Sequence, residues 1–246
     1  MTLEKEFKLK RLILDDSKIF EEFIETQKHP LSAYSFISIY IWKDIFNFYW
    51  RIFEGALCLF AKYGLNVFMY IPPIGNGNIK NAIEWSFDLM KTYNKNKKVI
   101  RIENIEEDKI RMFNSLGYKI SLRGYEYIYN AKSLIELKGN SFKDKRSAYN
   151  YFVKNYEYSY EDFKKDYTNE CLKLYRIWQD MRLKKFKDQF FRVLTEDSFS
   201  AHRCAMENYS KLKLIGRIVR INNRIKAYSL GFKLNEDIFC ILFEIA

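Results

Sequence analysis

The chain of 246 residues is 48% hydrophobic and 18% aromatic, a composition that excludes an intrinsically disordered protein and provides for a large packed core. Its formal net charge is +11, and no apolar run is long and uncharged enough for a signal peptide or a membrane-spanning helix. The sequence thus predicts a cytoplasmic protein made of one large domain or of two domains of about 120 residues each.

The first half predicts an α/β unit of two helices, a meander of strands, and then alternating helices and strands. Asp15 and Asp16 can cap a helix that runs to about residue 28, and a second apolar helix covers about residues 35–46. The further elements expected in chain order are strands at 48–53, 56–61 and 66–71, a helix capped by Asn78 that runs to residue 93, a strand at 99–102, a helix at 106–116, and strands at 118–122 and 126–129.

The second half predicts a repeat of this plan. The expected elements are helices at 141–155, 168–186 and 196–208, followed by strands at 213–221, 224–234 and 238–243. Between the first two of these strands, Asn222-Asn223 predicts a hairpin turn, because Asn tolerates the positive φ that such turns need. The corresponding strands of the first half are followed by further elements, so we expect the second unit to be incomplete.

Positive charge is concentrated in one block of the chain. Residues 138–226 hold 21 Lys and Arg against 11 Asp and Glu, whereas the rest of the chain holds 21 against 20. Such a block favours a polyanionic partner, which could be nucleic acid, anionic lipid or a phosphorylated substrate. The alternative is a solvated basic face without a partner.

Residues that could bind a metal are few and scattered. The four cysteines form no C-x-x-C pair and fit reduced thiols, and no H-E-x-x-H motif occurs. We therefore expect no metal site and no cofactor. His29 precedes Pro30 and is expected in a turn, while His202 lies in a helical pattern and is expected to be a surface or core residue.

Several short signatures follow one another along nearly the whole chain. They are Pro73-x-Gly75, Tyr127-Ile128-Tyr129, Leu137-x-Gly139-x-x-Phe142-x-x-Lys145-Arg146 with Asn150 and Phe152, then Trp178, Glu196, Gly216, Ala227, Gly231 and Phe243-Glu244-x-Ala246. In these signatures the chain resembles the bacterial phosphatidylglycerol lysyltransferase C-terminal domain family. The resemblance implies an α/β (α+β) fold of two tandem GNAT-like (acyl-CoA N-acyltransferase-like) modules, at residues 1–132 and 133–246.

The chain departs from the family pattern in two ways. Asn140-Ser141 stand where the family usually has a Lys pair, and Ser147 stands where it has Asn. Family members also continue for several tens of residues past the Phe-Glu-x-Ala signature, and that continuation completes their second module. By this comparison the second module is expected to be incomplete, with a part of the site missing.

The function that the resemblance implies is transfer of an aminoacyl group from aminoacyl-tRNA to a lipid or amine acceptor. In such a transfer the acceptor hydroxyl or amine attacks an activated ester. The catalyst aligns the two reactants, removes a proton and stabilises the developing oxyanion, and this chemistry needs no metal. Both the tRNA and a phospholipid headgroup are anionic. The implied partners are therefore aminoacyl-tRNA and an anionic phospholipid at a membrane surface, which the protein would reach peripherally.

The candidate binding residues lie on the helix expected at 141–155. Lys143, Lys145 and Arg146 can bind phosphate, and Arg favours bidentate contact. Tyr149 can stack on a base, and Asn150 can donate to a phosphate or a carbonyl. The alternative is a solvated helix face whose aromatic side chains pack inward.

Glu244 is the candidate catalytic residue. It ends an apolar strand, where a carboxylate is costly unless paired, and it can orient the attacking amine or pair with Arg220. A second basic cluster closes the helix expected at 168–186, where positive charge is favourable by itself. This cluster consists of Arg182, Lys184, Lys185 and Lys187.

Two other functions stay open. An acetyl-CoA-dependent N-acetyltransferase needs a loop that cradles pyrophosphate, and residues 72–77 have the spacing for one, but their two prolines remove donors and favour a plain turn. A non-catalytic relative would keep the basic groove for RNA or a membrane surface. It would show salt-sensitive binding without transfer.

Overall fold

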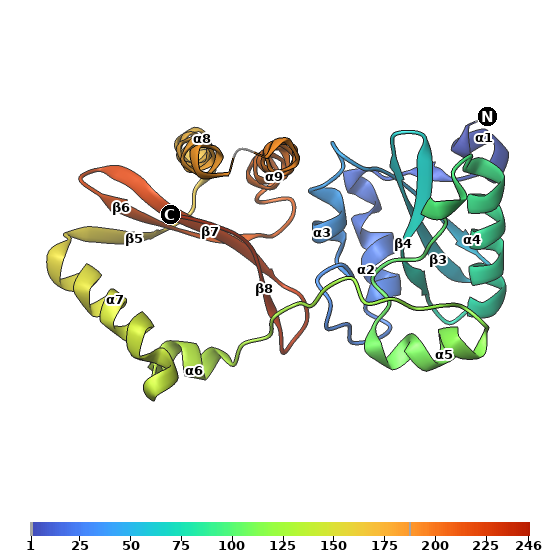
Figure 1. Cartoon of the computed structure of the whole chain (residues 1–246), viewed down its shortest axis with the longest axis horizontal. Coiled ribbons are helices and arrows are strands. Elements are labelled where there is room, and N and C mark those ends of the chain that lie inside the picture. Colours follow the sequence, from blue (N-terminus) through green and yellow to red (C-terminus); the bar gives the residue numbers. More distant parts are fainter. Residues whose placement is uncertain (1, 187) are drawn as a thin grey trace.

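The computed structural model describes residues 2–186 and 188–246 and contains two four-stranded antiparallel sheets, one in each half of the chain (Figure 1). The first sheet has the order β1-β2-β3-β4 and the second the order β5-β6-β7-β8. The strands are β1 (Lys10–Arg11), β2 (Asn47–Phe53), β3 (Ala56–Tyr63), β4 (Asn66–Ile74), β5 (Tyr158–Asp162), β6 (Ile215–Ile221), β7 (Arg224–Lys233) and β8 (Phe239–Ile245).

Both halves follow the same plan of one strand, two helices and three antiparallel strands, which confirms the predicted repeat. In the first half the two helices are α2 (Ser17–Ile24) and α3 (Phe36–Tyr40), and in the second they are α8 (Thr168–Lys185) and α9 (Gln189–Glu207). The helices are α1 (Leu3–Phe7), α2 (Ser17–Ile24), α3 (Phe36–Tyr40), α4 (Ile79–Tyr93), α5 (Ile110–Ser115), α6 (Ala131–Glu136), α7 (Lys143–Asn155), α8 (Thr168–Lys185) and α9 (Gln189–Glu207). The opening strands β1 and β5 are short and polar, and the sequence pattern misses both.

Local sequence signals explain where several elements begin and end. Asn78 caps α4 as predicted, because its side chain accepts a hydrogen bond from the Asn81 amide at 3.1 Å. The Asn222-Asn223 turn has φ values of 49° and 60°, so the predicted hairpin is confirmed. Helix α9 starts earlier than expected because the side chain of Asp188 accepts from the Phe190 amide at 3.0 Å and caps it there.

Three strands predicted in the first half are wrong. At 99–102 only Ile102 forms an isolated parallel bridge, with Met69 of β4. The segments at 118–122 and 126–129 are irregular, with Tyr118 and Ile120 half-buried and the other residues exposed, and they pair with no strand among the described residues. Their β-type composition favours a strand, but a strand also needs a partner to pair with, and these segments have none among the described residues. Glu126 instead accepts hydrogen bonds from the Ser32 amide (2.9 Å) and hydroxyl (2.8 Å), which ties this segment to the first half.

The two halves share one continuous cluster of buried apolar residues, with α9 lying next to α3 (Figure 1). Polar contacts from the turn between β7 and β8 add to this junction. The side-chain amide of Asn235 donates to the His29 carbonyl at 3.1 Å, and Lys28 pairs with Asp237 at 2.9 Å. The loop at 28–29 is therefore held by the second half of the chain.

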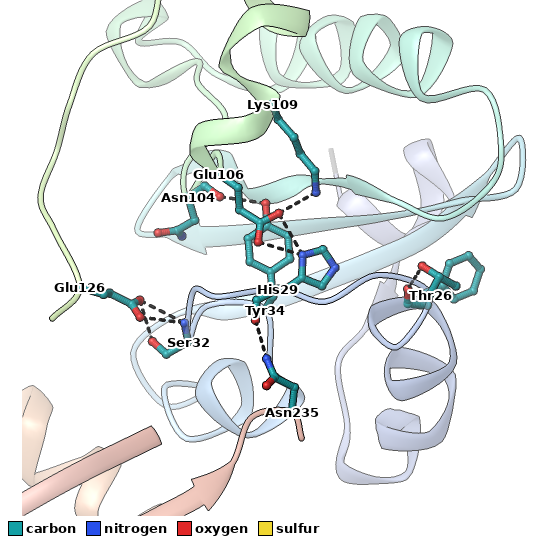
Figure 2. A network of polar contacts seen from close by, with 10 residues as sticks. Thr26, His29, Ser32, Tyr34, Asn104, Glu106, Lys109, Glu126 and Asn235 are labelled. Atoms are coloured by element: carbon teal, nitrogen blue, oxygen red, sulfur yellow. Dashed lines mark hydrogen bonds and ion pairs between the residues drawn. The ribbon is translucent and has the colours of Figure 1, made fainter. Parts of the chain in front are cut away.

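A buried charged network underlies that loop (Figure 2). His29 is only 3% exposed, and its Nδ1 lies 3.0 Å from both carboxylate oxygens of Glu106. Lys109 donates to the same carboxylate at 2.7 Å, and the Tyr34 ring stacks on His29 at 4.2 Å. Burial alone would raise the pKa of Glu106, but the bonds from His29 and Lys109 outweigh it and lower that pKa. Sequence reasoning expected only a turn residue at position 29.

His202 of α9 lies in the core of the second half, one of the two positions expected for it. Its Nδ1 is 2.8 Å from the Tyr228 hydroxyl, and its ring stacks on Phe243 at a centroid distance of 3.7 Å. Burial lowers the pKa of His202 to about 3. The imidazole is thus an uncharged part of the core.

Replacing Glu106 should strongly destabilise the fold. In Glu106→Ala the buried His29 and the half-buried Lys109 lose their shared acceptor, and breaking the buried pair costs about 3–5 kcal/mol in free energy of unfolding. Because the pKa of Glu106 is lowered in the folded state, its stabilisation is present above the unfolded pKa and is lost as the pH falls through the folded value. Urea titrations at neutral and acidic pH measure both effects. The exposed neighbour variant Glu107→Ala is the control, and equal losses in the two variants would contradict this role.

The depressed pKa of His202 should make stability depend on pH. Its unfolded pKa is near 6.5 and its folded pKa about 3, so the unfolded state binds the proton first as the pH falls. Between these values the group should remove about 1.4 kcal/mol of stability per pH unit. In His202→Gln this contribution disappears, so the stability gap between wild type and variant should narrow from pH 6.5 downward. Thermal melts across this pH range measure the difference in stability between wild type and His202→Gln. A difference that stays constant would contradict the interpretation that His202 is buried and uncharged.

Candidate functional site

Helix α7 carries five of the six predicted site residues and stands on the side of the second sheet opposite α8 and α9 (Figure 1). The helix is described in full and buries none of its residues. Helical spacing puts Lys143, Arg146 and Asn150 on one face and puts Lys145 and Tyr149 on the adjacent face. The structure therefore brings these five side chains together on one exposed element.

Arg146 has a structural contact that sequence reasoning missed. Its Nη1 donates to the carbonyls of Leu137 and Gly139, the latter at 3.1 Å, and so it closes the turn that leads into α7. Leu137 and Gly139 both have positive φ, at 48° and 86°, and a non-glycine residue in that region marks a turn that needs outside support. A guanidinium has five N–H donors, so the others stay available to a ligand.

The lysines of α7 keep their charge free for a ligand. Over residues 2–186 and 188–246, neither Lys143 nor Lys145 lies within 4.0 Å of a carboxylate. Tyr149 is 57% exposed. The ring of Phe152 packs on the ring of Tyr158, with a centroid distance of 4.9 Å, and this contact fixes the end of α7 to β5. Helix α7 thus presents cations and an open aromatic face to solvent.

Glu244 lies on a different element from the binding residues. It pairs with Ser229 across β8 and β7 and is exposed, while its neighbours Phe243 and Ile245 are buried under the helices, as strand alternation requires. No hydrogen bond or ion pair between described residues joins β8 to α7. The structure therefore does not bring Glu244 into contact with the other five candidates.

Of the two roles left open for Glu244, pairing with Arg220 is not the one that the structure shows, because Arg220 binds other carboxylates. The Arg220 guanidinium lies 3.4 Å from Glu161 on one side and 3.4 Å from Glu170 on the other. These carboxylates sit on β5 and α8, so Arg220 joins the opening strand of the second half to its first helix. Since Glu244 is exposed, its carboxylate needs no partner.

The second basic cluster lies at the end of α8. Arg182, Lys184 and Lys185 are exposed, and Lys187 lies outside the described residues. Nearby, Glu196 of α9 accepts from Arg176 at 2.6 Å and from Gln179 at 2.9 Å. The bond from Arg176 lowers the pKa of Glu196. Because Arg176 and Gln179 belong to α8, the signature residue Glu196 connects α8 to α9.

The glycines at 75 and 77 form a turn that is filled by the protein itself. A Cβ at Gly77 would lie 2.0 Å from the Glu54 carbonyl oxygen, and one at Gly75 would lie 2.8 Å from the Gly55 carbonyl oxygen. The Asn78 amide, the donor that a phosphate would need, already donates to the Glu54 carbonyl at 3.1 Å. The turn interpretation is confirmed, since the Glu54–Gly55 backbone packs against this loop and already uses the Asn78 amide.

No helix in the described part of the chain has both the length and the apolar character needed to cross a membrane.

Comparison with solved structures identifies the fold. A conserved protein of unknown function from Bacteroides thetaiotaomicron is 22% identical, with a TM-score of 0.82 over 97% of this chain and 79% of that one. L-PGS from Bacillus licheniformis is 18% identical, with a TM-score of 0.57 over 94% and 66% of the two chains. The C-terminal domain of a putative lysylphosphatidylglycerol synthetase from Agrobacterium fabrum is 10% identical, with a TM-score of 0.51 over 94% and 68%. The predicted α/β fold of tandem GNAT-like modules is confirmed.

The sequence itself matches a family profile, although no protein of curated function matches it. The profile is that of the phosphatidylglycerol lysyltransferase C-terminal region, and it covers residues 25–244. That span includes α7, all of β8 except Ile245, and most of both sheets. The chain therefore belongs to the phosphatidylglycerol lysyltransferase C-terminal domain family.

Proposed function

We propose that this chain transfers an aminoacyl group from aminoacyl-tRNA to a lipid or amine acceptor. The observation that carries the proposal is the family match over residues 25–244. The free cationic side chains of α7 support it, because the tRNA is a polyanion and charge contributes most of the affinity for such a partner.

The proposed roles follow from the chemistry of each side chain. Lys143 and Lys145 bind tRNA phosphates, and Arg146 adds donors from the guanidinium nitrogens that its turn leaves free. Tyr149 stacks on an unpaired base, and Asn150 donates to a phosphate or carbonyl. Anionic phospholipid at a membrane surface is the second proposed partner.

Glu244 is proposed to serve the chemical step. The acceptor hydroxyl or amine attacks the ester carbonyl carbon of the aminoacyl-tRNA while the carboxylate of Glu244 accepts its proton. The bond between that carbon and the ribose oxygen then breaks, and the ribose oxygen takes up a proton as it leaves. Binding and proton transfer are thus assigned to separate elements, α7 and β8.

We also propose a boundary near residue 132 between a module at 1–132 and a module at 133–246. The exposed segment at 121–130 supports it, since few contacts cross such a linker.

A non-catalytic binding relative is the second candidate. The observation that favours it is the separation of Glu244 from α7, since a basic surface alone binds RNA without turnover. The acetyl-CoA alternative has lost its main support, because the Glu54–Gly55 turn occupies the loop at 75–77.

Removing the α7 lysines should weaken tRNA binding in a salt-dependent way. For Lys143→Ala combined with Lys145→Ala, the slope of log K against log salt should fall by about one unit for each tRNA phosphate that the protein no longer neutralises. Filter binding of charged tRNA over a salt series measures it. The matched control is Lys80→Ala on α4, where an exposed lysine pairs with Glu84 at 3.9 Å. Equal salt slopes in the α7 variant and in Lys80→Ala would contradict the role of α7. Arg146 is left unchanged in this test because it closes a turn.

Replacing Glu244 should separate chemistry from binding. Loss of a general base typically reduces the rate by about 10²–10⁴-fold, so Glu244→Gln should bind tRNA normally but transfer the labelled aminoacyl group at least a hundredfold more slowly. The control is Glu207→Gln, an exposed residue at the end of α9. Unchanged transfer would exclude Glu244 as the base. Wild-type binding without any transfer would establish the non-catalytic relative instead.

A further inference from the structure

One face of the second sheet is apolar and exposed. Helices α8 and α9 cover the other face, where Tyr228 and Phe243 are buried. Strand alternation turns the residues between them away from these helices, and there Tyr160, Ile215 and Ile241 are 65%, 47% and 52% exposed. A sheet face that stays in water normally carries polar residues, so this face has the composition of a surface that packs against something.

The apolar residues of this face form rows across the strands. Tyr160 of β5 pairs with Val219 of β6, and Gly231 of β7 pairs with Ile215 on one side and with Ile241 on the other. Side chains opposite each other in such pairs are about 5 Å apart. The surface is called the open face below and is defined by Tyr158, Tyr160, Ile215, Val219, Phe239 and Ile241.

The first half of the chain, built on the same plan, has a helix on the corresponding face. Residues 56–61 of β3 are all buried, so both faces of the first sheet are covered. Helix α2 packs on one face, through Phe20 against Trp50, and α4 packs on the other, through Trp85 against Phe60. By this internal comparison, the element that suits the open face is a helix.

Helix α7 lies on the open-face side of the second sheet and is itself unpacked (Figure 1). None of its 13 residues is buried, although a helix of this length is only marginally stable in water without packing. Tyr149, Phe152 and Tyr156 share one side of the helix through their spacing of three and four residues. Phe152 of this side already contacts Tyr158 of the open face. The aromatic side of α7 is therefore joined to the open face at one end.

The charges of the two surfaces are complementary. Helix α7 carries four basic residues and one acidic residue. On the sheet, Arg217 forms an ion pair with Asp162, whereas Glu244 has no basic group within 4.0 Å over residues 2–186 and 188–246. A cationic helix laid on this face would supply that carboxylate with a partner.

The length of α7 matches the distance that it would have to cover. The strand register runs from Asp162, four residues after Tyr158, across the sheet to Glu244 on β8. At about 4.8 Å between strands and about 3.3 Å per residue, Glu244 lies about 19 Å from Tyr158. A helix of 13 residues is about 20 Å long, so its first turn would reach Glu244. Tyr149, halfway along, would then lie over Ala227.

We propose that α7 is a lid that closes on the open face by rotating about residues 156–157. The exposed, irregular residues 127–130 at the far side of α6 give the chain the slack to follow. Closure brings the cationic first turn of α7 next to Glu244, so the two parts of the candidate site that are separate in the structure meet. Only this consequence for catalysis rests on the proposed function.

Disulfide trapping of the full chain, without substrate, tests the closure. The background is Cys240→Ser, because the other three cysteines are buried. In it, Tyr149→Cys combined with Ala227→Cys should form an intramolecular disulfide under mild oxidation, seen as a mobility shift on a non-reducing gel. The matched control replaces Tyr151, on the opposite side of α7, instead of Tyr149. It should react at least about tenfold more slowly, because the two Cα atoms must come within about 7 Å.

A charge on the open face should keep the lid open. Val219→Asp, added to the trapping pair, should slow disulfide formation at least about tenfold, because closure would bury its carboxylate. The control is Leu65→Asp, which changes an exposed apolar residue of the first half and should leave the rate unchanged. Circular dichroism checks that each variant is folded.

Several results would overturn the proposal. They are an absence of the disulfide in the Tyr149 and Ala227 pair, equal rates with the Tyr151 control, and equal slowing by Val219→Asp and Leu65→Asp. A disulfide that links two chains would assign the open face to a second copy instead.

Transfer from charged tRNA, measured separately, distinguishes the lid from the proposed function. If wild type transfers the aminoacyl group, Val219→Asp should slow transfer while tRNA binding by α7 is retained. If wild type shows no transfer, the proposed function fails, and the trapping rates still decide whether α7 closes.

Discussion

The buried carboxylate of Glu106 is the constraint on which the arrangement of the two halves depends. It is acceptable in the interior only because His29 and Lys109 bind it, and that requirement fixes the backbone of the loop at 28–29. The carbonyl of the same loop is then in place to accept from Asn235 of the second half. The electrostatic requirement of Glu106 in the first half thereby fixes the backbone to which a turn of the second half binds, while the shared apolar cluster joins the two halves elsewhere.

Much of the fold could be predicted from the sequence, because it rests on local signals. The cap at Asn78 and the turn at Asn222-Asn223 are each decided by a few neighbouring residues, and the hydrophobic runs of β3 and β4 are buried as their pattern indicates. The errors occur where structure depends on distant partners. The tyrosine-rich segment at 118–129 has strand composition, but whether it pairs is decided by the availability of a sheet edge. Nothing near position 29 in the sequence indicates a carboxylate 77 residues away.

The candidate site, like the fold, could be predicted only in part. The cluster on α7 follows from helical spacing and could be predicted directly from the sequence. The bond from Arg146 to the turn at 137–139 could not, although the family signature contains both ends of it, because a signature does not say which of its residues touch each other or a ligand. The carboxylate partners of Arg220 likewise lie on β5 and α8, and β5 is too short and polar to recognise, so the sequence left pairing with Glu244 open as one alternative.

The irregular segment at 118–130 has a consequence for the integrity of the molecule. It is held to the first half by the bonds of Glu126 to Ser32, by the ion pair of Arg123 with Glu103 and by Tyr118, whereas the apolar cluster passes directly between the halves. A protease that cuts this segment would therefore break the peptide chain without separating the pieces, since the contacts that unite them lie elsewhere. The covalent link between the modules and the physical link between them are different parts of the protein, so two separately made fragments have the surfaces needed to reassemble.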